Sequence, residues 1–241
     1  MNFAAVIPAR MGSTRFPGKI LASRTGKPLI EHVWERVRSA SGLSRIVIAT
    51  DDERIAEAVR IFGGEAWMTR PDHPNGTARI AEVAERLDCD AIINVQGDEP
   101  EIDPGTIEAV IDALRSRPDV PMSTAAAPFG GDDAADPNVV KVTLRVDGTA
   151  LCFSRSLIPF DRDRAGSPPP LRHLGIYGYR RAFLATYVSL PETPLERCER
   201  LEQLRVLEHG FPIAVALVAS GAHGIDTEEQ YDAFVARSRR S

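Results

Sequence analysis

The chain has 241 residues, and its contents of 43% hydrophobic and 26% charged residues are typical of a globular protein with a buried core. The net charge of −5 disfavours a general nucleic-acid binder, which carries a basic excess, and no run of about 18 apolar residues is present to insert into a membrane. Three widely spaced cysteines, Cys89, Cys152 and Cys198, disfavour a disulfide framework or a zinc site and favour a reducing cytoplasm.

Strands and helices alternate through the first half of the chain. Short apolar runs predict strands at residues 3–8, 45–50 and 91–96, with a weaker one at 65–69. Four apolar stripes at helical spacing predict helices: Ile30, Val33, Trp34 and Val37; Ile55, Val59 and Phe62; Ile80, Val83, Ala84 and Leu87; and Ile107, Val110, Ile111 and Leu114. Because such alternation requires crossover connections, we predict an α/β fold with a mostly parallel sheet flanked by helices.

The pattern changes after about residue 120. Two strand-like runs at 139–146 and 149–156 flank Asp147-Gly148, which predicts an antiparallel hairpin. The remaining predicted elements are a strand at 173–180, a long helix at 194–209, a strand at 212–218 and a last helix from about Thr227. We therefore predict a single domain over residues 1–241, with an antiparallel subdomain inserted at about 120–190 and the final strand and helix returning to the first sheet.

A polar loop, PARMGSTRFPGK at residues 8–19, follows the first predicted strand directly. In an open parallel sheet, ligands bind at the carboxyl ends of the strands, where this loop begins. The loop combines three cations that match phosphate oxygens, two glycines that allow close approach of the backbone, and two hydroxyl donors: Arg10, Arg15, Lys19, Gly12, Gly18, Ser13 and Thr14. It predicts a polyphosphate site, with a solvated turn of scattered charge as the alternative.

Two familiar phosphate-binding motifs do not fit this loop. The dinucleotide motif G-x-G-x-x-G is absent, which disfavours an NAD enzyme. The Walker A motif G-x-x-x-x-G-K-[ST] fails twice, because five residues separate Gly12 from Gly18 and because Ile20 follows Lys19 where a hydroxyl residue is required.

Two carboxylates far apart in the sequence are candidate Mg²⁺ ligands. Asp98 follows the predicted strand at 91–96, and Asp226 precedes the last helix. If both lie at the edge of one sheet they converge, and Mg²⁺ binds a few protein oxygens together with substrate phosphates. Two alternatives stay open. Asp226 could cap the helix, where Thr227 and Gln230 fit a capping box, and Asp98 could be an ordinary aspartate at a turn.

Eight segments carry a family resemblance along nearly the whole chain. In order they are IPARMGSTRFPGK, ATDDERIAEAV, DHPNGTARIAEV, NVQGDEP, FSRSLIPFDRDR, RHLGIYGYR, LEQLRVLEHG and GIDTEEQ. Together they resemble the 3-deoxy-manno-octulosonate cytidylyltransferases, or CMP-Kdo synthetases. The resemblance implies a fold like that of the nucleotide-diphospho-sugar transferases, with the antiparallel insert building a homodimer. It also implies a reaction in which CTP and the acid sugar Kdo give CMP-Kdo and pyrophosphate, with Mg²⁺ as cofactor, for lipopolysaccharide biosynthesis.

The resemblance also implies roles for individual residues. The residues implied to bind CTP are Ala9, Arg10, Arg15, Lys19, Asn75, Gly76, Arg79 and Gln96. Binding of Kdo falls to Arg155, His173, Tyr177, Glu202 and Gln203. Asp98 and Asp226 are expected to hold Mg²⁺ and, with Lys19, to form the catalytic set.

The residue types support part of the implied Kdo pocket. Kdo carries a carboxylate, for which Arg155 is a fitting partner. His173 and Tyr177 are four apart on a predicted strand and therefore share a face, although packing on the sheet is an alternative reason for them. Glu202 and Gln203 have a second interpretation as the solvated face of a helix.

Two features depart from the family pattern. Serine is usual where Asn75 stands, and an acidic residue is usual where Ala78 stands, so the groups that recognise the base differ. Asparagine can still donate and accept hydrogen bonds. The loop between Arg164 and Arg172 is short, which alters the rim of the sugar pocket.

The expected chemistry is an in-line attack of the anomeric hydroxyl of Kdo on the α-phosphorus of CTP, helped by positioning and charge neutralisation. A related acid sugar, such as 8-amino-Kdo or a sialic acid, is the nearest alternative substrate. A transferase that uses a formed nucleotide sugar would carry Asp-x-Asp, whereas this chain has Gly97-Asp98-Glu99. A catalytically dead binding protein would have lost Lys19 or one of the two carboxylates.

Overall fold

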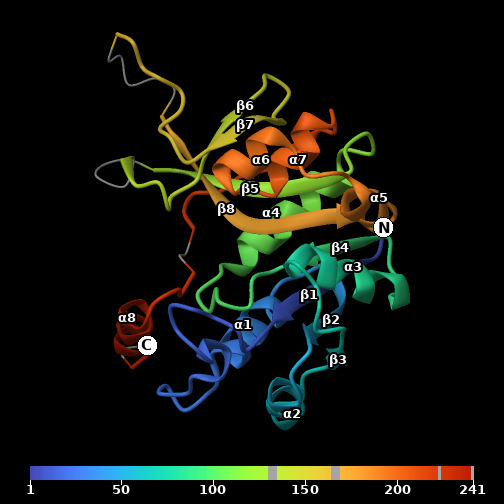
Figure 1. Cartoon of the computed structure of the whole chain (residues 1–241), viewed down its shortest axis with the longest axis vertical. Coiled ribbons are helices and arrows are strands. Elements are labelled where there is room, and N and C mark those ends of the chain that lie inside the picture. The colour runs from blue at the N-terminus through green and yellow to red at the C-terminus, as the bar shows by residue number, and fades with distance from the viewer. Residues whose placement is uncertain (130–134, 164–168, 222–223, 240–241) are drawn as a thin grey trace. The chain divides into compact units, whose positions relative to one another are not determined.

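The computed structural model describes residues 1–129, 135–163, 169–221 and 224–239 (Figure 1). The chain forms two compact units, of which the first comprises Met1–Glu108 with Ala222–Ser241 and the second comprises Ala109–Gly221. No helix of the described residues is long and apolar enough to cross a membrane. The short loop that starts at Arg164 falls mainly outside the described residues.

Four strands of the first unit pair in parallel in the order β3-β2-β1-β4. Their bounds are β1 Phe3–Ala9, β2 Leu43–Thr50, β3 Ala66–Met68 and β4 Ala91–Asn94. Strand β1 pairs with β2 on one side and β4 on the other, and six of its seven residues are buried. A strand buried on both faces reads as a continuous apolar run, which is why these strands were predictable from the sequence.

Helices connect and follow these strands as the apolar stripes predict. They are α1 Leu29–Arg38, α2 Glu53–Ile61, α3 Gly76–Arg86 and α4 Pro104–Arg115, and a short 3-10 helix, η1 Lys19–Leu21, was not predicted. Helix α2 is followed by Gly63, whose φ of 79° ends the regular structure. Stripe residues such as Val33, Ile55 and Ile80 are fully buried, so each helix turns its apolar face into the core.

Antiparallel pairing dominates the second unit. Its strands are β5 Met122–Pro128, β6 Lys141–Leu144, β7 Ala150–Ser154, β8 Leu171–Arg180 and β9 Ile213–Leu217. The predicted hairpin is confirmed, because β6 and β7 pair antiparallel around Gly148, whose φ is 81°. Strand β8 pairs antiparallel with β5 and β6, whereas β9 pairs in parallel with β5. The predicted class, an α/β fold with an antiparallel portion, is therefore confirmed.

The predicted long helix at 194–209 is wrong. It is two short helices, α6 Pro194–Glu199 and α7 Gln203–Glu208, separated at Arg200. Arg200 has a φ of 54°, a left-handed conformation that ends α6. The break turns Leu201 and Leu204 into the core, where they are 6% and 2% exposed. Their apolar spacing is what made the segment look like one helix.

Two elements of the second unit were not predicted. Strand β5 consists of small and hydroxyl-bearing residues, Met-Ser-Thr-Ala-Ala-Ala-Pro, which carry little strand signal. Helix α5 Arg181–Ser189 follows β8 without a capping side chain that would mark its start.

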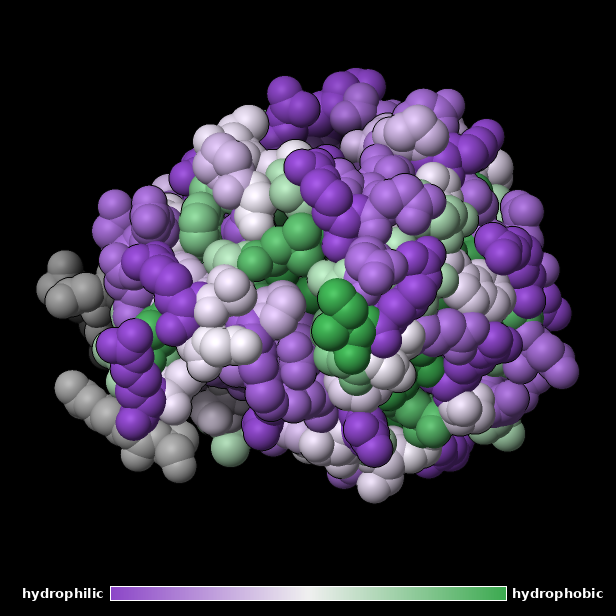
Figure 2. Space-filling model, turned by 90° about the horizontal axis from the view of Figure 1, so that it is seen from below, coloured by the Kyte–Doolittle hydropathy of each residue, from purple (hydrophilic) through white to green (hydrophobic). Residues whose placement is uncertain are grey.

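The last helix, α8 Glu228–Ser238, packs against an early part of the chain within the first unit (Figure 1). Ile225, Tyr231 and Phe234 form a buried cluster with Leu29, and Phe16 packs against it. Helix α8 therefore closes over the segment that follows the loop at 8–19. Seen from below, the molecule shows a mainly hydrophilic surface with small separate apolar groups (Figure 2).

Candidate functional site

A pocket of about 570 Å³ lies within the first unit, at the carboxyl ends of β1 and β4. This volume suits a small-molecule ligand, and the place is where ligands bind in parallel α/β sheets. The pocket collects all the residues predicted to bind CTP and Mg²⁺: Ala9, Arg10, Arg15, Lys19, Asn75, Gly76, Arg79, Gln96, Asp98 and Asp226. It is also lined by Gly12, Ser13, Thr14, His73 and Gly97, among others.

Three glycines in and beside the pocket differ in their backbone conformation and surroundings. Gly18, directly before Lys19, has a φ of 71°, a left-handed conformation that favours glycine. Gly12 does not have a positive φ, and a Cβ there would meet nothing within 4 Å, so the close approach of a ligand to its backbone stays a prediction. Two backbone segments of the protein approach closely at Gly97, where a Cβ would lie 2.8 Å from the carbonyl oxygen of Pro8. Gly97 thus lets the segment before Asp98 pass against the end of β1.

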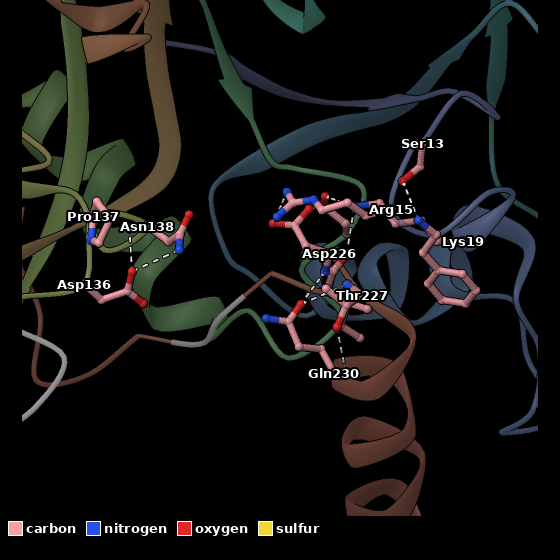
Figure 3. A network of polar contacts seen from close by, with 12 residues as sticks. Ser13, Arg15, Lys19, Asp136, Pro137, Asn138, Asp226, Thr227 and Gln230 are labelled. Atoms are coloured by element: carbon pink, nitrogen blue, oxygen red, sulfur yellow. Dashed lines mark hydrogen bonds and ion pairs between the residues drawn. The ribbon is translucent and has the colours of Figure 1, made fainter.

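The two distant carboxylates converge on Lys19. The Lys19 Nζ lies 2.6 Å from Asp98 Oδ2 and 3.2 Å from Asp226 Oδ1, and it also donates to the carbonyl oxygen of Ile225 at 2.8 Å. Arg15 adds a second cation, with a guanidinium nitrogen 3.0 Å from Asp226 Oδ2. Figure 3 shows Arg15 and Asp226 in one polar network. The predicted convergence is confirmed, and the alternative that Asp98 is only a turn aspartate is not supported.

Capping of α8 does not use the Asp226 carboxylate. Thr227 is the N-cap, and its hydroxyl accepts from the backbone nitrogen of Gln230 at 3.3 Å. The Gln230 side chain accepts in return from the backbone nitrogens of Asp226 and Thr227, at 2.6 and 3.0 Å (Figure 3). This is the predicted capping box. It fixes the backbone of Asp226 and leaves its carboxylate for Lys19 and Arg15.

Helix α8 is attached to the segment after the loop at 8–19 by contacts that the sequence did not reveal. The Tyr231 hydroxyl accepts from the backbone nitrogen of Arg24 at 2.9 Å, and the Arg24 guanidinium lies over the Tyr231 ring. A second contact joins Arg24 to Asp232 at 2.6 Å. These contacts and the cluster around Leu29 hold Asp226 beside Lys19. The only signal in the sequence was the apolar residues of α8, which indicate burial but not the segment against which the helix packs.

Another part of the pocket is built around a buried arginine. Arg79 is 5% exposed and lies 3.1 Å from Asp51 Oδ2 and 2.5 Å from Thr69 Oγ1. Asp51 follows β2 as Asp98 follows β4, a signal that sequence analysis did not use. Asn75 caps α3, because its Oδ1 accepts from the backbone nitrogen of Ala78 at 2.9 Å. The Asn75 oxygen is therefore engaged with the helix, and its amide NH₂ is the group it can offer to a base.

The residues predicted to bind Kdo all lie in the second unit. The Arg155 guanidinium donates to backbone carbonyls of Glu199, Pro137 and Arg200, at 2.7, 2.9 and 3.5 Å. It thereby fixes the end of β7 beside the break between α6 and α7. Arg155 has five N–H donors, so three such bonds leave part of its fork for an anion.

His173 and Tyr177 lie side by side on β8, as their spacing predicts. Their ring centroids are 5.4 Å apart, and the His173 ring also meets Phe153 edge-on at 4.9 Å. The His173 Nε2 lies 2.9 Å from the hydroxyl of Thr124. Burial lowers the pKa of His173 to about 3, so the imidazole is neutral near pH 7.

Glu202 and Gln203 stand at the start of α7, directly after the helix break. Gln203 is 3% exposed, so the interpretation as a solvated helix face is wrong for this residue. The backbone carbonyl of Glu202 accepts from the hydroxyl of Tyr187 at 3.1 Å. The structure thus brings His173 and Tyr177 together. It also places Arg155 against Glu199 and Arg200, which precede Glu202 in the sequence.

The carboxylates of Asp98 and Asp226 fit a hard cation whose remaining ligands are phosphate oxygens and water. The described residues contain no group of three or more His, Cys, Asp or Glu side chains that could hold a metal ion by themselves. Asp98 and Asp226 nonetheless share one cationic partner and therefore point at a common place. Mg²⁺ usually takes one or two carboxylates and completes its shell with phosphate and water, so this pair fits it.

Comparison with known proteins gives a consistent result. The cytidylyltransferase family model matches residues 4–215. The 3-deoxy-manno-octulosonate cytidylyltransferase of Syntrophotalea carbinolica is 50% identical over 238 residues, covering 95% of each chain. That of Geobacter metallireducens is 46% identical over 251 residues, covering 100% of this chain and 99% of its own.

Solved structures agree. The structure of CMP:2-keto-3-deoxy-manno-octonic acid synthetase complexed with CTP has a TM-score of 0.96 and 42% identity, covering 100% of this chain and 99% of that one. The 4-diphosphocytidyl-2C-methyl-D-erythritol synthase of Anaerococcus prevotii has a TM-score of 0.66 at 14% identity, covering 99% of both chains, and shares the fold alone.

Proposed function

Because this chain belongs to the 3-deoxy-manno-octulosonate cytidylyltransferase family, we propose that it transfers CMP from CTP to Kdo, releasing pyrophosphate and supplying CMP-Kdo for lipopolysaccharide biosynthesis. One observation carries the assignment of the site: Asp98 and Asp226 meet at Lys19 in a pocket that also contains Arg10 and Arg15. Cations for phosphates and carboxylates for a divalent ion are then present in one place.

The chain's main contribution to the reaction is to bind and orient CTP. Arg10, Arg15 and Lys19 bring three positive charges to the pocket, where they neutralise the triphosphate and then the leaving pyrophosphate. Asn75, Gly76, Arg79 and Gln96 form the wall assigned to the nucleoside. Arg79 is fixed by Asp51 and Thr69, so this wall is organised before the ligand arrives.

We assign the divalent ion, Mg²⁺, to Asp98 and Asp226. When bound, Mg²⁺ neutralises charge on the phosphates. Dependence of activity on the ion is part of the proposal.

The sugar is assigned to the second unit, with Arg155 as partner of the Kdo carboxylate and with His173, Tyr177, Glu202 and Gln203 around it. In the transfer step, the anomeric hydroxyl oxygen of Kdo bonds to the α-phosphorus, and the bond from that phosphorus to the oxygen of the β-phosphate breaks. The hydroxyl proton leaves to solvent, and pyrophosphate departs. His73, the histidine on the pocket wall, is paired with Glu82 at 2.5 Å, so we assign it no role as base.

The test is a substrate panel. Each nucleoside triphosphate is combined with Kdo, 8-amino-Kdo or a sialic acid, with and without Mg²⁺, and pyrophosphate release is measured. We expect release with CTP, Kdo and Mg²⁺ together. Faster release with 8-amino-Kdo or a sialic acid would make that sugar the substrate in place of Kdo. If none of the acid sugars in the panel gives pyrophosphate release, the proposed function is overturned.

We further propose a homodimer in the cytoplasm. Large apolar side chains of the second unit are exposed, among them Leu151 at 56%, Phe160 at 86% and Leu217 at 60%, and a second copy of the chain would cover such surface. All three cysteines are free, as in proteins of reducing compartments. Light scattering of the purified protein measures the oligomeric state.

A further inference from the structure

Lys19 has an unusual environment for a lysine that is assigned to phosphates. Its ammonium lies among three oxygens, those of Asp98, Asp226 and the Ile225 backbone, at 2.6, 3.2 and 2.8 Å. Only 11% of its side chain is exposed. An ammonium has three protons, so these three acceptors use its full hydrogen-bonding capacity.

The same oxygens suit a divalent cation. Two carboxylates and a backbone carbonyl are hard oxygen donors, the type that Mg²⁺, Mn²⁺ and Ca²⁺ take as ligands. The ammonium of Lys19 and a divalent ion therefore require the same two carboxylates, and the 2.6 Å contact leaves no room for an ion between Lys19 and Asp98.

The local charges are balanced with Lys19 in place. Asp98 and Asp226 carry two negative charges, and Lys19 and Arg15 carry two positive charges against them. A divalent ion alone would add two positive charges next to two existing ones, at distances where repulsion is strong. A nucleoside triphosphate changes this balance, because it brings several negative charges and new acceptors for the lysine.

On this basis, and resting on the proposed function, we propose that Lys19 competes with the divalent ion for Asp98 and Asp226. The triphosphate releases the lysine by offering it phosphate oxygens, and the ion enters together with the nucleotide. Lys19 is thus both a phosphate ligand and a barrier against a metal ion without nucleotide.

Binding of Mn²⁺ to the protein without nucleotide tests this directly. Free Mn²⁺ gives an electron paramagnetic resonance signal that is lost on binding, so titration yields a dissociation constant without any measurement of activity. We expect weak binding to the unmodified chain and binding at least about tenfold tighter to Lys19→Met and Lys19→Gln, because a full positive charge next to the ion is removed. Two variants are used so that the comparison survives poor folding of one, and melting curves establish which variants are folded.

Two controls locate the effect. Lys27→Met removes an exposed lysine of the same segment, which pairs with Glu35 outside the pocket, and should leave the Mn²⁺ affinity unchanged. Adding Asp98→Asn to Lys19→Met should abolish the gain, because it removes a ligand of the proposed ion.

Equal Mn²⁺ affinity in the unmodified chain and in the folded Lys19 variants overturns the inference, and so does tight binding to the unmodified chain without nucleotide. A gain that survives Asp98→Asn also overturns it, because the ion would then lie elsewhere. The substrate panel reports the proposed function separately, so a chain that transfers CMP but shows no gain in Mn²⁺ binding would contradict only the competition between Lys19 and the ion.

Discussion

The two units each bury a lysine, and the two lysines are balanced in opposite ways. Lys19 of the first unit donates to the carboxylates of Asp98 and Asp226, which line a pocket, and to one backbone carbonyl, that of Ile225. Lys141 of the second unit is 0% exposed and donates to the backbone carbonyls of Asp136 and Arg155, at 2.7 and 2.8 Å. Burial lowers the pKa of Lys141. Carboxylate partners can be exchanged for a ligand, whereas carbonyls in the main chain cannot move away without local unfolding.

Beside Lys141, a carboxylate also bonds to the second unit's own chain and not to a pocket residue. The Arg155 backbone nitrogen and the Ser154 hydroxyl both donate to the carboxylate of Glu199, at 2.9 and 2.7 Å. The Arg155 side chain then donates to the Glu199 carbonyl. Polar side chains in this part of the second unit bond mainly to the main chain and fix its conformation. In the first unit's pocket, charged side chains bond mainly to one another. Substitutions in the two places should therefore affect different quantities.

The largest expected effect is on turnover, from Asp98→Asn. The amide keeps the shape of the side chain but loses the charge that pairs with Lys19 and that we assign to the metal, so kcat should fall by at least about a hundredfold. The melting temperature should change little, since 28% of the Asp98 side chain is exposed to water. Steady-state kinetics and thermal melting measure the two quantities.

Glu101→Gln is the matched control for this substitution. Glu101 pairs with Arg237 and does not line the pocket, so the same change from carboxylate to amide there should keep turnover near normal. Near-normal turnover of Asp98→Asn would contradict the metal assignment.

A smaller effect, on stability and not on chemistry, is expected from Lys141→Met. Lys141 is fully buried, and removing its ammonium leaves two partly buried carbonyls without this donor, which should lower the free energy of unfolding by about 2–3 kcal/mol. Lys19→Met should cost less, about 1 kcal/mol, because the Asp98 and Asp226 side chains are 28% and 45% exposed and can be hydrated, so that only the Ile225 carbonyl loses its donor in a buried position. Urea unfolding compares the two variants, and the contrast between the lysines fails if Lys19→Met proves the more costly.

In the second unit, a modest dependence of stability on pH is expected from His173. The pKa of His173 is lowered to about 3 in the folded chain, against an ordinary value of 6.5. Below pH 6.5 the unfolded chain binds a proton that the folded chain does not, so stability falls as pH falls, by up to about 2 kcal/mol between pH 6.5 and 5. Unfolding curves of His173→Phe should lose this part of the slope. An unchanged slope would show that His173 is not the group responsible.

Periodicity and local motifs were enough to predict much of the fold. Strand β1 and helices α1 to α3 follow from apolar patterns, and the capping box at Thr227 marks the start of α8. The break at Arg200 was not predictable, because an arginine at positive φ has no local signal and glycine is the residue expected there. Strand β5 was missed because its alanines favour no strand.

The candidate site was predictable in its parts but not in its contacts. A cationic loop and two aspartates, each after a strand or before a helix, indicated a phosphate and metal site. That Lys19 would contact both aspartates was not predictable, since its partners lie 79 and 207 positions away in the sequence. The contact between buried Arg79 and Asp51 was not predictable for the same reason, because contacts of this kind depend on how the strands align.

The distance in sequence between Lys19 and Asp226 has a consequence for synthesis on the ribosome. The cationic loop emerges early, and its acidic partner from beyond residue 221 arrives only after the whole second unit has been made. A nascent or truncated chain that stops before Asp226 presents the loop with one of its two aspartates missing, and without the helix that packs on it. Polyphosphates in the surrounding medium would meet an unbalanced positive surface during that interval. Completion of the chain is thus the event that neutralises it.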